Sequence, residues 1–132
     1  MNNVELNSKG VNKKIKANIL SDEEMKQIGF SGKYYEGTVH EQDCPYWYFC
    51  RMLKTSNKRI EISFNVKIPK DGSDISIDVL DEGFLQPYDY QMLLERNPDN
   101  QVASNVQEQV EKWMKYLQDN NVLSGHEYGE YI

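Results

Sequence analysis

Two histidines and two cysteines are the residues of this chain best suited to hold a metal ion or to attack a substrate. They are His40, Cys44, Cys50 and His126, and four such ligands would suit a tetrahedral zinc site. The H-x3-C-x5-C spacing lacks the close cysteine pair of a zinc knuckle, and Cys50 falls inside an expected strand, where small buried thiols are common. We therefore expect two reduced thiols and no bound metal. A thiol nucleophile would also need a neighbouring base, which no local motif supplies.

Other catalytic patterns are missing from the sequence. Asp78, Asp81 and Glu82 could bind a hard cation, but they straddle a strand end without the spacing of a calcium loop, which favours solvated carboxylates. The chain contains no phosphate-binding loop, no dinucleotide-binding glycine motif, no G-x-S-x-G and no H-E-x-x-H. We therefore predict no catalytic residue and no cofactor.

Aromatic residues give the clearest hint of function. The 132 residues include nine Tyr and two Trp, and these types are enriched where proteins bind one another. The alternative is that several rings cover the edges of the core, because tyrosine buries its ring and keeps its hydroxyl in water. The candidate binding residues are Tyr88, Tyr90, His126, Tyr128 and Tyr131.

The charge is spread unevenly along the chain. Residues 1–70 hold 12 Lys and Arg against 8 Asp and Glu, whereas residues 71–132 hold 3 against 13. A net charge of −6 disfavours nucleic acid as a partner, because nonspecific binding needs a basic face. Either the acidic half is a solvated surface, or it steers the protein toward a basic protein partner.

The length predicts a single domain. Residues 1–14 lack periodicity and are expected to form a flexible arm before a domain over residues 15–132. No apolar run reaches the ~20 residues of a membrane helix, and the N-terminus has no apolar signal region. We expect a cytoplasmic protein that does not bind membranes.

Local patterns predict the elements. Ser21 to Glu24 is a capping-box signature that begins a short helix ending at Gly29. Residues 46–53 form an aromatic strand, and residues 60–68 and 75–79 alternate apolar and polar side chains as half-buried strands do. Residues 88–96 form a second short helix. Residues 33–40 are ambiguous between loop and strand.

The strand pattern also predicts a register. A four-residue turn over 69–72 would place Phe64 opposite Ile77, and the same reading of residues 55–58 would place Phe49 opposite Phe64. This phase buries Trp47, Phe49 and Leu53 and puts Arg51 on the apolar face. The other phase would bury the alternate residues, Tyr46, Tyr48, Cys50 and Met52.

An apolar stripe marks a long amphipathic helix over about residues 99–119. The predicted fold is therefore α+β: a three-stranded antiparallel meander packed on one face by this C-terminal helix, with short flanking helices. The aromatic tail, residues 122–132, should fold back onto the domain. The expected core comprises Ile62, Phe64, Val66, Ile77, Val79, Val106, Val110, Trp113 and Leu117.

Four segments carry a resemblance: SDEEMKQIGF, YWYFCR, EISFNVKIPKDGSDISIDVLDEGFLQPYDYQ and SGHEYGEYI. Together they resemble small uncharacterised proteins of low-GC Gram-positive bacteria and their mobile elements. The resemblance implies a bacterial, cytoplasmic accessory protein and carries over no functional residues.

Two functions remain open from the sequence. The first is a non-enzymatic interaction protein with an acidic, Tyr-rich surface, which includes inhibitor or immunity-like roles. The alternative is a small-molecule-binding or enzymatic domain with a cleft near His126.

Overall fold

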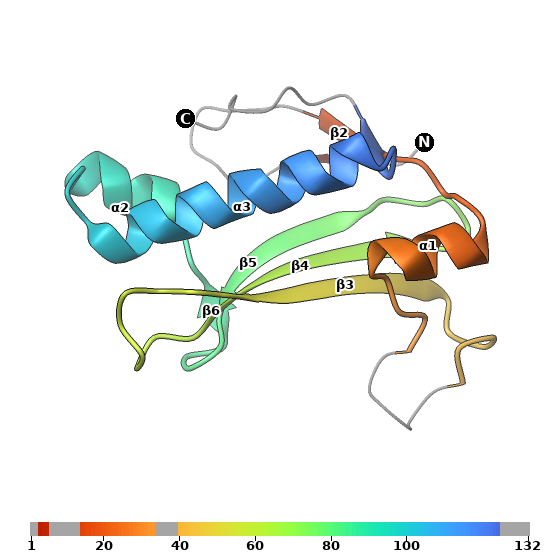
Figure 1. Ribbon diagram of the computed structural model, residues 1–132, viewed down its shortest axis with the longest axis horizontal. Helices are drawn as coiled ribbons and strands as arrows, with labels where there is room; N and C mark the ends of the chain where they lie inside the picture. Colours follow the sequence, from red (N-terminus) through yellow and green to blue (C-terminus); the bar gives the residue numbers. More distant parts are fainter. Residues whose placement is uncertain (1–2, 6–13, 34–39, 125–132) are drawn as a thin grey trace.

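The protein has the predicted α+β fold, with its helices gathered over one face of an antiparallel sheet (Figure 1). The computed structural model describes residues 3–5, 14–33 and 40–124. The large sheet contains, in order, β3 (Tyr46–Leu53), β4 (Ile62–Pro69), β5 (Ser76–Asp81) and β6 (Gln86–Pro87). The helices are α1 (Asp22–Ile28), α2 (Tyr90–Arg96) and α3 (Gln101–Asp119). A small sheet joins β1 (Asn3–Glu5), β2 (Lys14–Ala17) and β7 (Leu123–Ser124).

Side-chain caps begin all three helices. The Ser21 side chain accepts from the amide of Glu24, and the Glu24 carboxylate accepts from the amide of Ser21, which confirms the predicted capping box. Asp89 and Asn100 cap α2 and α3 in the same way, each accepting from an amide three residues on. These caps fix where each helix starts relative to the sheet.

The core lies between α1, α3 and the covered face of the large sheet. Seven of the nine predicted core residues are buried, and Phe64, Val106 and Leu117 are fully enclosed. Val79 and Trp113 are only partly buried. Trp113 is partly buried because it lies at the margin of the α3 stripe, where its ring packs edge-on against Phe49 with centroids 5.7 Å apart.

The predicted strand register is wrong by two residues in both hairpins. Phe64 pairs with Val79 instead of Ile77, and Phe49 pairs with Val66 instead of Phe64. Both connections are longer than the four residues assumed, since β4 ends at Pro69 and β5 begins at Ser76. A slip of two residues keeps every side chain on its own face, so the expected apolar face survives.

Of the two phases considered for β3, the first is confirmed, because Trp47, Phe49 and Leu53 are buried. Arg51 shares their face and is partly exposed. Its guanidinium carbon lies 4.0 Å from the centre of the Phe49 ring, and its Nη1 donates to the Cys50 carbonyl at 2.8 Å. The aliphatic stem therefore covers the core while the charge remains at the surface.

The two outer edges of the large sheet are partly occupied. Ser31 forms a β-bridge with Tyr48, and each amide donates to the other carbonyl. Gln109 of α3 reaches the backbone of Lys54, donating from Nε2 to its carbonyl and accepting from its amide at 2.7 Å. At the opposite edge, β6 ends at Pro87, which has no amide hydrogen.

The structure adds elements that the sequence did not reveal. Residues 81–87, expected as a plain connection, include the short strand β6, and residues 123–124 pair with β2. Val122 and Leu123 are buried, but residues 125–132 lie outside the described residues, so docking of the aromatic tail stays a prediction. The arm over 1–14 is described only at Asn3–Glu5, which pairs with β2, and at Lys14. The ambiguous segment 34–39 is also outside.

No helix in the described ranges is both long enough and apolar enough to cross a membrane.

Candidate functional site

The large sheet has one face that no described helix covers, and we call it the open face. All three helices lie on the other side of the sheet in Figure 1. Alternation along β3, β4, β5 and β6 assigns the side chains of the open face. They are Tyr46, Tyr48, Cys50, Met52, Ser63, Asn65, Lys67, Pro69, Ser76, Asp78, Leu80 and Pro87.

A hydrogen-bonded chain of polar groups crosses the middle of the open face. Ser63 is fully buried; its hydroxyl donates to Oε2 of Glu82 and accepts from Nδ2 of Asn65 at 2.8 Å. Partial desolvation raises the pKa of the neighbouring Cys50 thiol, and the Glu82 carboxylate raises that pKa further. A raised pKa keeps sulfur protonated, which is the opposite of what a nucleophilic cysteine requires. The hydrogen bonds of Ser63 with Glu82 and Asn65 link neighbouring parts of the sheet, and these groups do not activate the Cys50 thiol.

Two tyrosines occupy one end of the open face. The rings of Tyr46 and Tyr48 lie 6.0 Å apart at a tilted angle, and Nζ of Lys67 lies 4.1 Å above the Tyr46 ring. The contact places a positive charge beside two partly buried aromatic rings. This end of the face therefore combines aromatic area with a cation.

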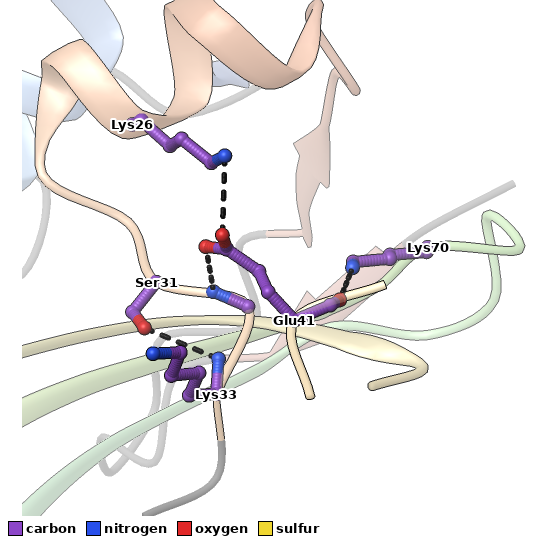
Figure 2. A network of polar contacts seen from close by, with 6 residues as sticks. Lys26, Ser31, Lys33, Glu41 and Lys70 are labelled. Atoms are coloured by element: carbon purple, nitrogen blue, oxygen red, sulfur yellow. Dashed lines mark hydrogen bonds and ion pairs between the residues drawn. The ribbon is translucent and has the colours of Figure 1, made fainter. Parts of the chain in front are cut away.

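Near this aromatic end, Glu41 contacts three segments that are distant in sequence (Figure 2). Its Oε2 lies 3.1 Å from Nζ of Lys26 on α1, its Oε1 accepts from the Gly32 amide at 3.1 Å, and its carbonyl accepts from Lys70 at 2.9 Å. The Gly32 hydrogen bond, followed by the Lys26 contact, lowers the pKa of Glu41. A Cβ atom at Gly32 would lie 2.5 Å from Cγ of Glu41. Glycine at this position therefore allows the close approach of the Glu41 side chain.

The opposite end of the sheet carries an exposed apolar tip on the turn between β5 and β6. Phe84 is 78% exposed and Leu85 is 77% exposed. Oδ1 of Asp81 accepts from the amides of Gly83 and Phe84, which fixes the turn. Leu85 has φ of 52°, a left-handed conformation that is unfavourable for a side chain with Cβ. We call residues 82–85 the hairpin tip.

A row of mainly apolar side chains lies on the open face at the end of the sheet that carries the hairpin tip. Met52, Ser63, Leu80 and Pro87 form one cross-strand row, and Met52 is 54% exposed. Three of the four side chains in this row are apolar. The row lies at the same end of the sheet as the hairpin tip.

Only two of the predicted binding residues fall in the described chain. Tyr88 is partly buried, and burial followed by the charge of Asp81 raises its pKa. Tyr90 lies in the core at 8% exposure; burial, then Glu111, raises its pKa. Its ring is thus packed in the fold and does not contribute exposed surface. His126, Tyr128 and Tyr131 lie outside the described residues, as does any cleft around His126.

The groups considered for metal binding are dispersed where they are described. Cys44 is buried and its thiol donates to the Tyr46 carbonyl, whereas Cys50 is exposed on the open face. Within residues 3–5, 14–33 and 40–124, no three His, Cys, Asp or Glu side chains converge on one point. Asp78 and Asp81 belong to opposite faces of β5, because their positions differ by an odd number of residues.

An open cavity of about 450 Å³ lies between α1 and the end of α3. Its carboxylates are already engaged: Glu24 caps α1, and Asp119 pairs with Lys115 at 3.1 Å. No unpartnered charge in its lining points to a ligand.

Sequence reasoning missed the hairpin tip. The available signal was the pair Phe84-Leu85 inside the polar turn DEGFLQP, where neither strand nor helix periodicity offers the two side chains a core partner. Adjacent large apolar residues in such a turn indicate exposed surface.

Comparisons with known proteins identify a shared fold. No protein-family profile matches the chain, and no curated protein matches it. The solved structure of a DUF1831 family protein from Lactobacillus plantarum aligns with a TM-score of 0.62 at 12% identity, covering 94% of this chain and 95% of that one. The similarity shows a common fold. The neighbour comes from a low-GC Gram-positive bacterium, in agreement with the resemblance seen in the sequence.

Proposed function

We propose that this chain is a non-enzymatic accessory protein that acts by binding another protein through its open face and hairpin tip. The observation that carries the proposal is the exposure of Phe84 and Leu85, at 78% and 77%, on adjacent positions of one turn. Large apolar side chains that stand together in water mark interaction sites more often than single exposed ones do.

The turn is built to present these side chains. Asp81 holds the turn by two backbone hydrogen bonds, and Leu85 is kept at a φ of 52°. Strain of this kind persists only where the surrounding structure imposes it, and it concentrates at functional sites. A rigid tip also loses little entropy when it docks, which favours binding.

The tip belongs to an acidic stretch of the sequence, which supports a positively charged partner surface. Residues 71–95 contain seven Asp and Glu and no Lys or Arg. An acidic segment of this kind raises the rate at which the protein encounters a basic surface. An inhibitor or immunity-like protein that masks a basic enzyme belongs to this class.

Photo-crosslinking tests the proposal. A photoreactive amino acid in place of Phe84 should crosslink to a protein in lysate of the source cell, and unlabelled wild-type protein should compete with the product. The same group in place of Met92, 36% exposed on α2, is the matched control. Absence of any competed product at position 84, at low and at physiological salt, would contradict the proposal.

A further inference from the structure

The outer edge of β3 is occupied at two points and open between them. β3 forms one margin of the large sheet (Figure 1). Ser31 exchanges two backbone hydrogen bonds with Tyr48, and the side-chain amide of Gln109 pairs with both backbone groups of Lys54. In a strand, the six residues from one contact to the other span about 20 Å. Two groups that act as strand partners therefore bound a short stretch of edge.

Backbone groups in the middle of this edge have no partner among the described residues. Hydrogen-bonding directions alternate along an antiparallel strand, so Cys50 and Met52 direct their backbone groups away from β4, as Tyr48 does. Within the described chain, nothing accepts from the amides of Cys50 and Met52 or donates to the Met52 carbonyl. Both residues are exposed, Met52 by 54%. We call residues 50–52 the free edge, since it offers two donors and one acceptor to a further strand.

The side chain of Arg51 occupies the remaining position of the free edge. Its Nη1 donates to the Cys50 carbonyl at 2.8 Å, and its guanidinium carbon lies 4.0 Å from the centre of the Phe49 ring. Gly29 leaves room for this placement, because a Cβ atom there would lie 2.3 Å from Nη2 of Arg51. No Asp or Glu in the described ranges forms a salt bridge with Arg51. A cation held in place, without a carboxylate partner in these ranges, thus lies beside the open backbone groups.

We propose that the free edge binds an extended peptide of another protein, which adds a strand beside Met52 and places a carboxylate against Arg51. The added strand runs antiparallel to β3, in line with Ser31, and the free edge accommodates about three of its residues. Its backbone satisfies the amide and carbonyl of Met52, while its carboxylate accepts charge-assisted hydrogen bonds from the guanidinium. The free edge and the hairpin tip lie at opposite margins of the sheet. The inference therefore goes beyond the proposed function and does not depend on it.

Alternation assigns the side chains of the added strand. The residue opposite Arg51 lies on the covered side of the sheet, where an acidic side chain pairs with the guanidinium as opposite charges do across strands. Its two neighbours lie on the open face, where apolar side chains cover the exposed Met52. A C-terminal carboxylate at the Gly29 end of the free edge supplies the same charge. The site thus selects a carboxylate carried by an apolar, strand-forming segment.

A second copy of the chain fits this edge poorly. The two-fold pairing that uses both Cys50 and Met52 sets Arg51 of one copy against Arg51 of the other, which is repulsive. It also brings Ser31 of one copy onto Gln109 of the other, because both groups then occupy the same place in the ladder. Charge and the occupied ends of the edge both favour a different, acidic chain.

Three pentapeptides test the site by NMR titration of the full chain. The first, acetyl-Thr-Val-Glu-Val-Thr-amide, carries a side-chain carboxylate. The second, acetyl-Thr-Val-Gln-Val-Thr with a free C-terminus, carries a terminal carboxylate only, and the third, its C-terminal amide, carries none. We expect the first or the second to shift the Cys50 and Met52 amide signals saturably, with a dissociation constant below about 1 mM. The third should bind at least about tenfold more weakly. Whichever carboxylate peptide binds identifies the source of the charge.

Two substitutions separate the charge from the backbone pairing. Arg51→Met keeps the aliphatic stem but removes the cation, and it should weaken binding of the carboxylate peptide about tenfold or more. Met52→Pro removes the outward amide without removing a hydrogen bond to β4, and it should weaken binding to a similar degree. Met52→Ala keeps the amide and is the matched control, with an expected affinity within about threefold of wild type. Phe84→Ser, at the hairpin tip, should leave the affinity unchanged.

Three results would overturn the inference. The first is that neither carboxylate peptide shifts the Cys50 and Met52 amides at ~5 mM. The second is equal affinity for the uncharged peptide. The third is binding that survives both Arg51→Met and Met52→Pro, because it then takes place at another surface. Arg51→Met and the uncharged peptide decide the matter if the proline variant does not fold. A competed crosslink at position 84 would leave the proposed function in place in every case.

Discussion

Gln109 on α3 pairs with the backbone of Lys54 in the way that a neighbouring strand would. Its amide group accepts from the Lys54 N–H at 2.7 Å and donates to the Lys54 carbonyl, and the residues are 55 positions apart in sequence. These two hydrogen bonds connect α3 to the end of β3. Without them, the Lys54 amide and carbonyl would have to hydrogen-bond to water.

Loss of this amide should loosen the end of β3. Gln109→Ala removes both hydrogen bonds and should lower the free energy of unfolding by about 1–2 kcal/mol. The Lys54 amide should also exchange its hydrogen faster. Ser104→Ala, at an exposed position of the same helix, is the control. Unchanged exchange at Lys54 would show that the pairing does not hold in solution.

Phe64 tests the core. It is fully buried, and its ring packs edge-on against Phe49 with centroids 6.4 Å apart. Phe64→Ala should cost about 3–5 kcal/mol of unfolding free energy, measured by urea denaturation. Met52→Ala, on the open face, should change stability by less than about 0.5 kcal/mol in monomeric protein. Similar losses for the two variants would contradict the assignment of covered and open faces.

Gly29 is restricted twice, by its backbone and by Arg51. It has φ of 123°, and a Cβ atom there would lie 2.3 Å from Nη2 of Arg51. Gly29→Ala should destabilise the fold by about 1–3 kcal/mol. The cost should shrink but persist in an Arg51→Ala background, because the steric clash disappears and the backbone strain remains. Equal costs in both backgrounds, in a double-mutant cycle, would exclude the contact.

Leu85 offers a stabilising substitution. Leu85→Gly removes the penalty of a left-handed leucine and should raise the unfolding free energy by about 0.5–1 kcal/mol, after the added flexibility of glycine is subtracted. Phe84→Gly, whose φ is not positive, should give no such gain. Calorimetric melting temperatures distinguish the two. A destabilised Leu85→Gly variant would mean that the side chain is packed rather than exposed.

Glu111 should make stability depend on pH. It is 8% exposed, and its Oε2 has no hydrogen-bond partner among the described residues. Burial, and then the charge of Glu108, raises its pKa above the ordinary 4.5. Burial, and then the negative charge of Glu111, raises the pKa of the nearby Tyr90 hydroxyl.

The sign follows from proton linkage. Because the folded state holds this proton more tightly than the unfolded state, the contribution of Glu111 to stability is most favourable below about pH 4.5 and falls as pH rises through the folded pKa. Glu111→Gln should therefore be more stable than wild type at neutral pH, with a difference that vanishes in acid. A constant difference from pH 4 to pH 8 would refute the raised pKa.

Local chemistry made much of the fold predictable. The Ser21–Glu24 capping box, the alternation around Phe64 and the stripe along α3 each depend on neighbours in sequence, and each is confirmed. The register failed because it depends on the length of two turns, and turn length is set by hydrogen bonds such as that of the Lys70 amide to the Pro45 carbonyl. Such contacts join distant segments and leave no local pattern.

The candidate site was less predictable for a related reason. Residue type alone marks Tyr90 as a binding candidate, but its position on α2 directs it into the core. Phe84 gives no such signal, because a short turn has no periodicity to interpret. Exposure is a property of the assembled chain, and only the pairing of β5 with β6 places this residue at a tip.

Pro87 has a consequence for how the protein behaves when it is concentrated. It ends the outermost strand of the large sheet without an amide hydrogen, so a further strand cannot continue the ladder there. Growth by the addition of sheet edges, the route to filaments and amyloid, is blocked on that side. A chain that displays Phe84 and Leu85 to solvent beside this edge should therefore be less able to recruit a further strand there.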